Sequence, residues 1–151
     1  MVAPNKVSRK AFQKFDGERW NAMNDLLAFS DLEDLTPIQR KAHLAYWYMS
    51  EVYNGGHWQY FCNKAEYDHK EVVESLRGLG CEEHAEILIK ALSRLPENIC
   101  LPNTVHEFID GYDEVDLLDL DVEFGECSKR IEDYLENYLD QHESEFIEWI
   151  P

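Results

Sequence analysis

A helix start followed by a long apolar stripe limits the fold of this chain more than any other pattern in it. Thr36 can cap a helix, Pro37 suits the first helical position, and Gln39 stands three residues after the cap. Together they form a T-x-x-Q capping box. Apolar residues then recur every three or four positions, namely Ile38, Ala42, Ala45, Tyr46, Met49, Val52 and Tyr53. The helix should end at Asn54-Gly55-Gly56, because Gly and Asn adopt the left-handed conformation that closes a helix.

The same spacing predicts helices over most of the remaining chain. The predicted helices cover residues 7–30, 68–79, 82–95, a segment that begins at Thr104, and about 128–149, and a short helical turn covers 58–62. The first is broken at Asp16-Gly17, and the second begins with a second capping box, formed by Asp68 and Glu71. No segment alternates between apolar and polar residues and is also rich in β-branched residues, so no strand is predicted. A length of 151 residues fits one domain. We therefore expect an all-α, single compact multi-helix domain of six to eight helices over residues 1–151.

The net charge is concentrated at one end of the sequence. Residues 1–106 hold fifteen acidic and twelve basic side chains, a net charge of −3, whereas residues 107–151 hold sixteen and two, a net charge of −14. Such a field repels phosphate backbones and anionic membranes, which argues against direct nucleic-acid or membrane binding, and it attracts cations or a basic protein. Solubility alone does not require this asymmetry. The acidic C-terminal third, residues 107–151, is therefore predicted to be an interaction surface.

Two groups of acidic residues are the candidates for this partner-binding surface. The first is Asp110, Asp113, Glu114, Asp116, Asp119, Asp121, Glu123 and Glu126, and the second is Glu132, Asp133, Glu136 and Asp140 on the outer face of the last helix. Acidic residues three or four apart on a helix have Cβ atoms about 5–6 Å apart, comparable to neighbouring phosphates along a strand. Each group could therefore offer a row of anions to a basic helix.

The same stretch partly matches the calcium-binding loop of an EF-hand. Asp119, Asp121 and Glu123 occupy positions one, three and five of an EF-hand loop, but Phe124 replaces the glycine at position six and Arg130 the glutamate at position twelve. A dedicated calcium site is therefore not predicted, and weak divalent binding stays open.

Zinc and catalytic sites also lack a complete set of residues. Cys81 and His84 form a C-x-x-H pair without a second pair, so an ordinary helix start is favoured over zinc. Glu51 and His57 could perform acid–base chemistry, but the glycines between them indicate a structural turn. We predict no cofactor, no metal and no enzyme. The four cysteines form no C-x-x-C pair, and no secretory signal precedes them, so free thiols in a cytoplasmic protein are expected.

An aromatic stretch surrounds the glycines and allows two interpretations. It contains Tyr46-Trp47-Tyr48, Tyr53, Trp58 and Tyr60-Phe61. These side chains could line a ligand pocket, but such clusters more often form the core of a helical domain, and we predict a core.

The same stretch carries a resemblance to a known family. Residues 51–61 read E-V-Y-N-G-G-H-W-Q-Y-F and resemble the E-V-x-N-G-G-x-x-Q-Y-F signature of a bacterial family of acidic helical proteins that includes a DNA mimic. Leu76-Arg77-Gly78-Leu79-Gly80 is similar to a second block, and the likeness covers a core of about residues 36–95. The residues assigned to fold maintenance on this basis are Glu51, Asn54, Gly55, Gly56, Gln59, Tyr60 and Phe61.

The resemblance implies a helical fold and a negatively charged surface that imitates duplex DNA. The studied member occupies the DNA-binding face of a helix-turn-helix transcription factor and does so as a dimer, so a homodimer and a basic DNA-binding partner are implied here. The leading hypothesis is thus a non-enzymatic cytoplasmic regulator. An immunity or antitoxin-like inhibitor of a basic toxic enzyme is the alternative, and an enzyme using Glu51 and His57 ranks last.

Overall fold

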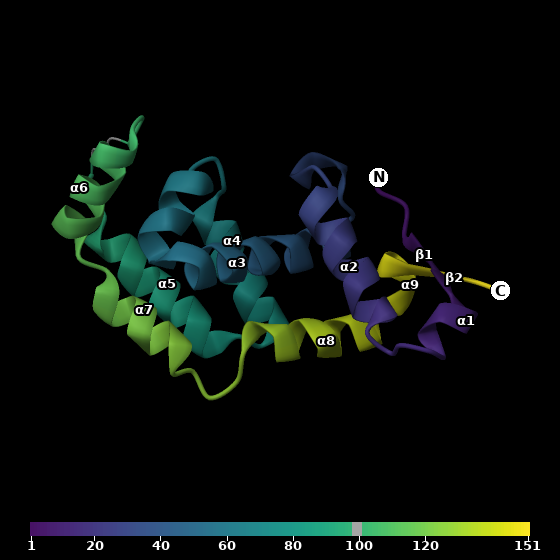
Figure 1. Ribbon diagram of the computed structural model, residues 1–151. Coiled ribbons are helices and arrows are strands. Elements are labelled where there is room, and N and C mark those ends of the chain that lie inside the picture. Colours follow the sequence, from purple (N-terminus) through teal and green to yellow (C-terminus); the bar gives the residue numbers. More distant parts are fainter. Residues whose placement is uncertain (98–100) are drawn as a thin grey trace.

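Helix α3 (Pro37–Asn63) runs through the middle of the structure, and most of the other helices pack against it (Figure 1). The computed structural model describes residues 1–97 and 101–151. Within these ranges the other elements are β1 (Asn5–Ser8), α1 (Arg9–Phe12), α2 (Glu18–Phe29), the 3-10 turn η1 (Leu32–Asp34), α4 (His69–Leu79), α5 (Glu82–Arg94), α6 (Val105–Val115), α7 (Leu118–Gly125), α8 (Ile131–Gln141), α9 (Glu143–Phe146) and β2 (Ile147–Ile150). Of the helices described, seven have seven or more residues, and 70% of the structure is helical. The predicted single all-α domain of six to eight helices is confirmed.

The predicted capping box at the start of α3 is present. The Thr36 side chain accepts a hydrogen bond from the Gln39 backbone N–H at 3.2 Å, and the Gln39 side chain accepts one from the Thr36 backbone N–H at 3.0 Å. Gly80 ends α4 as predicted, with a left-handed φ of 91°. These helix ends depend on local sequence, which is why periodicity and capping signals located them.

The predicted second capping box at the start of α4 is wrong. Asp68 caps the helix by accepting from the Lys70 backbone N–H at 3.0 Å, but Glu71 turns away from the helix end. Its carboxylate pairs instead with the Arg40 guanidinium, with Nη2 and Oε2 2.6 Å apart. A charged two-point contact is stronger than a bond to one backbone N–H, so the tertiary partner displaces the local one.

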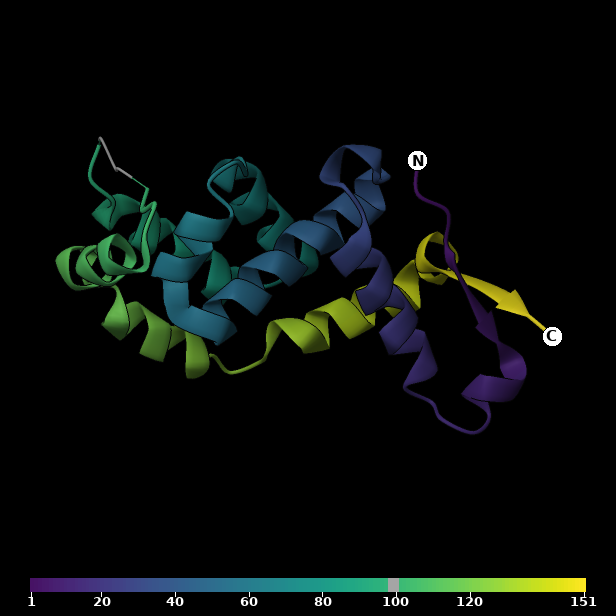
Figure 2. The same ribbon diagram turned by 45° about the horizontal axis from the view of Figure 1, so that its top comes forward.

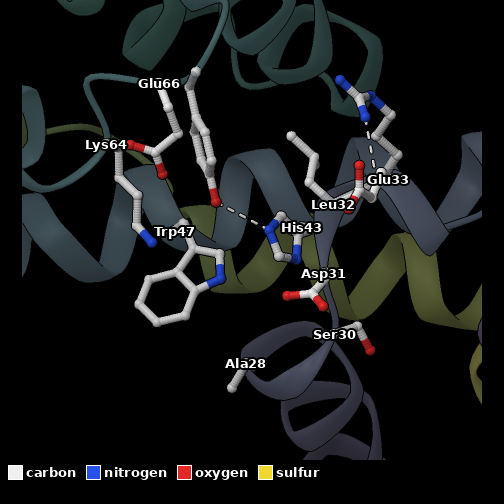
Figure 3. Close-up of a pocket in the computed structure, with 11 residues that line it drawn as sticks. Ala28, Ser30, Asp31, Leu32, Glu33, His43, Trp47, Lys64 and Glu66 are labelled. Carbon is white, nitrogen blue, oxygen red and sulfur yellow. Dashed lines mark hydrogen bonds between the residues drawn. The ribbon is translucent and has the colours of Figure 1, made fainter.

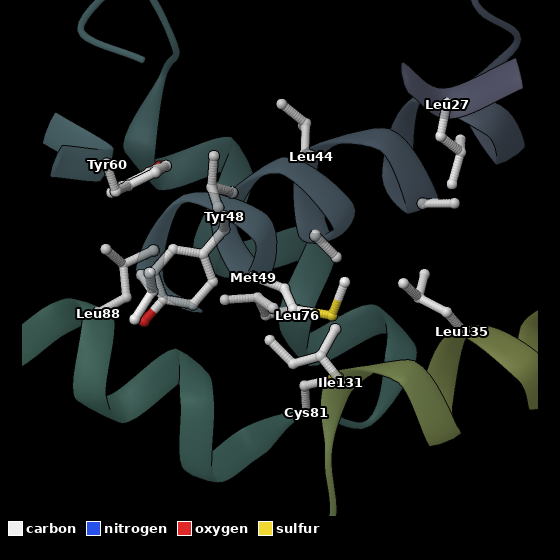
Figure 4. Packing of buried hydrophobic residues seen from close by; sticks show 14 of the residues in the cluster. Leu27, Leu44, Tyr48, Met49, Tyr60, Leu76, Cys81, Leu88, Ile131 and Leu135 are labelled. Atoms are coloured by element: carbon white, nitrogen blue, oxygen red, sulfur yellow. The ribbon is translucent and has the colours of Figure 1, made fainter. Parts of the chain in front are cut away.

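The core lies where α3 meets α4, α5 and α8. Figure 4 shows Tyr48 and Tyr60 of α3 against Leu76 of α4, Leu88 of α5 and Ile131 of α8. The apolar stripe predicted for α3 is buried at Ala42, Ala45, Met49 and Val52. Burial of this stripe accounts for most of the stability of such helices, because helix propensity alone contributes little.

The aromatic stretch divides between the core and the surface. Tyr48, Trp58, Tyr60 and Phe61 are buried, which confirms the predicted core. Trp47 is half-buried and lines a cavity, and Tyr53 is exposed.

Helix α3 does not end at Asn54-Gly55-Gly56, as the sequence predicted, but kinks there and continues to Asn63. Gly56 has φ 78° and ψ 179°, a conformation that is open essentially to glycine alone. The helix resumes because Trp58, Tyr60 and Phe61 bury their side chains in the core and hold the second segment in place. The predicted short helical turn over these aromatic residues is thus the far half of α3.

The two ends of the chain form a small parallel sheet that the sequence analysis did not predict. β1 pairs with β2 in parallel, with Val7 opposite Trp149. The predicted last helix accordingly ends at Gln141, and its continuation to Trp149 is wrong. Each strand has four residues. Strands this short exist only through pairing between distant segments, so their own sequences carry little signal.

The acidic helices and the chain termini lie at opposite ends of the molecule. Figure 2 shows α6 and α7 at one end, next to α5, and both termini with their strands at the other. The described residues contain no helix that is long and apolar enough to cross a membrane.

Candidate partner-binding surface

Helix α6 carries acidic side chains that are exposed and make no ion pair within the described residues. Asp110, Asp113 and Glu114 lie on it, and none of its residues is buried. The helix is fastened to α3 by a hydrogen bond of 2.9 Å from Trp58 Nε1 to the Phe108 carbonyl. α6 therefore presents carboxylates to solvent, while three of its apolar side chains pack against the core without being fully buried.

Asp116 breaks the predicted acidic row between α6 and α7. It adopts a left-handed φ of 45° at the end of α6 and is exposed. Asp and Asn tolerate this conformation better than other non-glycine residues, since their short polar side chains bond locally. The chain turns here, so acidic residues after Asp116 lie next to α5.

Two carboxylates of α7 are paired with bases of α5. Arg94 donates to Asp119 with two bonds of 2.5 and 2.8 Å, and the Lys90 ammonium lies 2.6 Å from Glu123 Oε1. The hydrogen bonds from Arg94 lower the pKa of Asp119 to about 2. Asp119 therefore stays ionised, but its charge is largely balanced by Arg94.

Asp121 points into the fold, which corrects its assignment to the partner-binding surface. Its Oδ1 accepts from the His57 backbone N–H at 2.8 Å and from His57 Nδ1 at 2.6 Å. A carboxylate can only accept, so Nδ1 carries a proton, and Nε2 lies 2.9 Å from the Tyr48 hydroxyl. Burial raises the pKa of Tyr48 well above its usual value, so this hydroxyl keeps its proton. The network fastens α7 to the kink of α3.

An acidic groove between α5 and α7 contains residues that the sequence analysis missed. The groove encloses about 480 Å³, and its carboxylates are Glu82, Glu83, Glu86, Glu123 and Glu126. Three of these come from α5, within the segment whose net charge is only −3. The sequence does contain one indication of these residues, because Glu82 and Glu86 are four positions apart on the polar face of a predicted helix.

Some carboxylates of the groove have hydrogen-bond or ion-pair partners, and others have none among the described residues. Arg77 pairs with Glu82 at 3.1 Å and with Glu86 at 2.6 Å. Glu83 accepts from the Ser128 hydroxyl and backbone N–H, which lowers the pKa of Glu83. Glu126 is exposed and makes no side-chain hydrogen bond or ion pair with the described residues. The groove retains a net negative charge, because five carboxylates face two basic partners, Arg77 and Lys90.

The acidic residues of α8 are mostly paired with nearby groups. Glu132 lies 2.6 Å from Arg130, Asp133 accepts from the Arg130 backbone N–H at 3.1 Å, and Asp140 pairs with Arg19 of α2. Glu136 is exposed without such a partner. The predicted residues that are exposed and have neither an ion pair nor a side-chain hydrogen bond among the described residues are thus Asp110, Asp113, Glu114, Asp116, Glu126 and Glu136.

The signature residues around the kink contact one another. Glu51 is buried and accepts from Gln59 Nε2 at 2.8 Å and from Asn63 Nδ2 at 2.9 Å. Tyr60 is bonded to His69 Nδ1 at 2.9 Å, and Phe61 is buried. Gly55 lies so close to Gln59 that an added Cβ would be 2.7 Å from its Cδ. Asn54 is exposed.

Glu51 and His57 take different partners and do not form the acid–base pair considered from the sequence. Glu51 is bonded to side-chain amides, and His57, which is fully buried, is bonded to Asp121 and Tyr48. The hydrogen bonds of both residues are accounted for by the fold.

The metal sites considered from the sequence are not assembled. Asp119, Asp121 and Glu123 each bind a different side chain, so they do not converge as EF-hand ligands. Cys81 and His84 are buried at the start of α5, where Cys81 is the N-cap residue. Residues 1–97 and 101–151 contain no group of three or more His, Cys, Asp or Glu side chains that could hold a metal ion. Cys62, Cys81 and Cys127 are free, and Cys100 lies outside the described residues.

Comparison with known proteins gives one match. The sequence model of a family described as "DMP19-like protein" matches residues 33–142, which is more than half of the chain. The match begins just before α3 and ends at the close of α8, so it leaves out β1, α1, α2 and the elements after α8. No match was found among curated proteins or among solved structures.

Proposed function

The chain belongs to the DMP19-like protein family, and we propose from this premise that it binds a basic DNA-binding protein by imitating the charge of duplex DNA. The observation that carries the proposal is the set of exposed carboxylates without ion pairs in the described residues. Asp110, Asp113, Glu114 and Asp116 supply them on and next to α6, and Glu126 continues them toward the acidic groove. The partner is a transcription factor or nucleoid protein, of which the helix-turn-helix type is one candidate.

The spacing of these carboxylates suits such a partner. Asp113 and Glu114 follow Asp110 by three and four residues on one helix, which places their Cβ atoms about 5–6 Å from that of Asp110. DNA carries one charge per roughly 1.7 Å of axis when both strands are counted, and proteins neutralise it with Lys and Arg. A row of side-chain anions on a rigid helix offers the Lys and Arg side chains of such a protein an alternative to the phosphates. The same row repels DNA itself.

Binding of this kind is driven by charge and therefore depends on salt. Complementary fields raise the rate of association, and the Debye length is only about 10 Å at 0.1 M salt. A catalytic role forms no part of this proposal, and the acid–base candidates Glu51 and His57 are buried. It acts in the cytoplasm, where its partner meets DNA, and as a homodimer.

Affinity capture from a lysate of the source cell tests the proposal. The full chain is immobilised, and bound proteins are eluted either by a salt gradient or by duplex DNA as competitor. Wild type is compared with a variant in which Asp110, Asp113, Glu114 and Asp116 become the corresponding amides. Asparagine suits the left-handed position 116, so this variant should keep its helical circular dichroism.

A matched control variant carries four amides elsewhere. Asp16, Asp25, Asp34 and Glu74 are exposed and make no side-chain hydrogen bond or ion pair with the described residues, so the control loses the same net charge. We expect one basic DNA-binding protein to be released by both salt and DNA, retained by the control and lost with the α6 variant.

Other outcomes would contradict the proposal. Equal retention by both variants would show that the carboxylates of α6 do not form the surface. Release by salt alone of an enzyme that thereby regains activity would favour the immunity or antitoxin-like alternative. Capture of no protein at low salt would leave the acidic residues a role in solubility only.

A further inference from the structure

A second pocket lies on the side of α3 that faces the loop to α4, and no residue of α6 or α7 lines it. It encloses about 470 Å³ (Figure 3). One wall is the face of α3 that carries His43 and Trp47, and a second is the loop with Lys64, Glu66 and Tyr67. The segment from the end of α2 through η1 closes the third side. A volume of this size is typical of small-molecule sites.

The aromatic side chains of this pocket already hold an ammonium group. Lys64 Nζ lies 3.8 Å from the centroid of a Trp47 ring and 5.3 Å from that of Tyr67. Both distances are within the roughly 6 Å at which the electron-rich face of a ring attracts a cation, and tryptophan is the strongest partner. Lys64 has no carboxylate within 4.0 Å among the described residues. Its ammonium is therefore held chiefly by the rings.

The other groups around the pocket favour a cation over an anion. Asp31, Glu33 and Glu66 are exposed carboxylates on its rim. Arg40 offers no free positive charge, because its guanidinium is bonded to Glu71 and to the Leu32 carbonyl. The three rim carboxylates therefore outnumber the one ammonium of Lys64.

His43 adds no positive charge to the floor of the pocket. It is buried, and its Nε2 lies 3.0 Å from the Tyr67 hydroxyl (Figure 3). Burial lowers the pKa of His43 to about 4, so the ring is neutral at neutral pH. The bond also fixes Tyr67 in the position in which its ring faces Lys64.

From this geometry we infer that the pocket binds a primary alkylammonium group, which takes the place of Lys64 on the Trp47 and Tyr67 rings. The Lys64 side chain is then a tethered competitor that occupies the cage until a ligand displaces it. A lysine side chain of another protein and a free polyamine share this chemistry. The inference does not depend on the proposed function, because its residues lie outside α6 and α7.

The indole N–H signals in ¹H–¹⁵N NMR spectra provide the test. The chain has four tryptophans, so the Trp47 signal is assigned by its loss in Trp47→Leu. Two probes are titrated at fixed ionic strength: spermidine for the free amine, and Nα-acetyl-lysine methylamide for a protein side chain. We expect saturable shifts of the Trp47 signal with one or both, and the probe that binds more tightly identifies the source.

Three variants and two matched controls separate the cage from the general acidity of the protein. Lys64→Met removes the competitor and should tighten binding about two- to five-fold, while Trp47→Leu should weaken it about five-fold, as measured by calorimetry. Glu66→Gln should also weaken binding. Lys70→Met and Glu74→Gln change exposed side chains outside the pocket and should leave the affinity close to that of wild type.

Two results would overturn the inference. The first is the absence of saturable Trp47 shifts with either probe in both wild type and Lys64→Met, a variant that leaves the aromatic side chains in place. The second is an affinity that falls equally in Glu66→Gln and Glu74→Gln, since this would place the amines on the acidic surface as a whole.

Discussion

Replacing Gly56 by alanine should destabilise the protein far more than the same change at Gly125. Gly56 is buried at the kink of α3 and has φ 78°. A Cβ atom added there would overlap with Asp121 Oδ2 and lie 2.9 Å from Asp121 Cγ. Gly125, at the end of α7, has no such neighbour within 4 Å. The two glycines therefore form a matched pair.

Two terms set the magnitude of the loss. The strained backbone conformation costs about 1–3 kcal/mol for a residue with a side chain. The added Cβ also displaces Asp121, whose Oδ1 lies 2.8 Å from the His57 backbone N and 2.6 Å from Nδ1. Leaving such a buried group unpaired costs about 1–3 kcal/mol. The sum, about 2–6 kcal/mol, is a large part of the roughly 5–15 kcal/mol that stabilises a typical domain.

Urea unfolding followed by far-ultraviolet circular dichroism measures this loss. We expect Gly56→Ala to lower the midpoint and, at roughly 2–4 °C per kcal/mol, to lower Tm by roughly 4–24 °C. Gly125→Ala should stay within about 1 kcal/mol of wild type, because alanine is the better helix former and meets no neighbour.

A double-mutant cycle separates the two terms. In an Asp121→Ala background the overlap is gone and only the backbone strain remains, so Gly56→Ala should cost less there than in wild type. A free energy of unfolding of Gly56→Ala within about 0.5 kcal/mol of wild type would refute the predicted strain and overlap at this position. An equal cost in both backgrounds would show that Gly56 does not make room for Asp121.

Three further predictions concern pH, an ion pair and the attachment of α6. The pKa of His43 is lowered in the fold to about 4, so the unfolded chain takes up the proton first. The contribution of His43 to the free energy of unfolding is therefore complete above about pH 6.5, and it falls by up to about 3 kcal/mol as the pH drops toward 4. His43→Gln should flatten this part of the curve of urea midpoint against pH. An unchanged curve would contradict the lowered pKa of His43. Arg94→Gln should raise the pKa of Asp119 from about 2 toward its ordinary value, which an NMR titration of the carboxyl carbon would detect. Gly111→Ala would place a Cβ against the Trp58 ring. Amide hydrogen exchange should therefore accelerate over residues 105–115, with little change in the urea midpoint. Unchanged exchange would show that the contact between Gly111 and Trp58 does not keep α6 in place.

The helices were largely predictable from the sequence because the relevant forces act over a few residues. The capping box at Thr36 and the left-handed Gly80 are local hydrogen-bond and backbone effects, and both stand where predicted. The kink at Gly56 and the strands β1 and β2 were not predicted in their true form. Each depends on contacts between segments far apart in sequence, which a local pattern does not contain.

The candidate surface divides in the same way. The sequence by itself determined how many acidic residues the chain carries and that they concentrate after residue 106. Only the tertiary structure decided which of these charges face solvent without a partner. It turned Asp121 inward to His57, set Arg94 against Asp119, and brought Glu83 of α5 beside α7. The reason is physical: a charge is fixed by the residue type, whereas its neutralisation depends on distance, and distances between helices are set by packing.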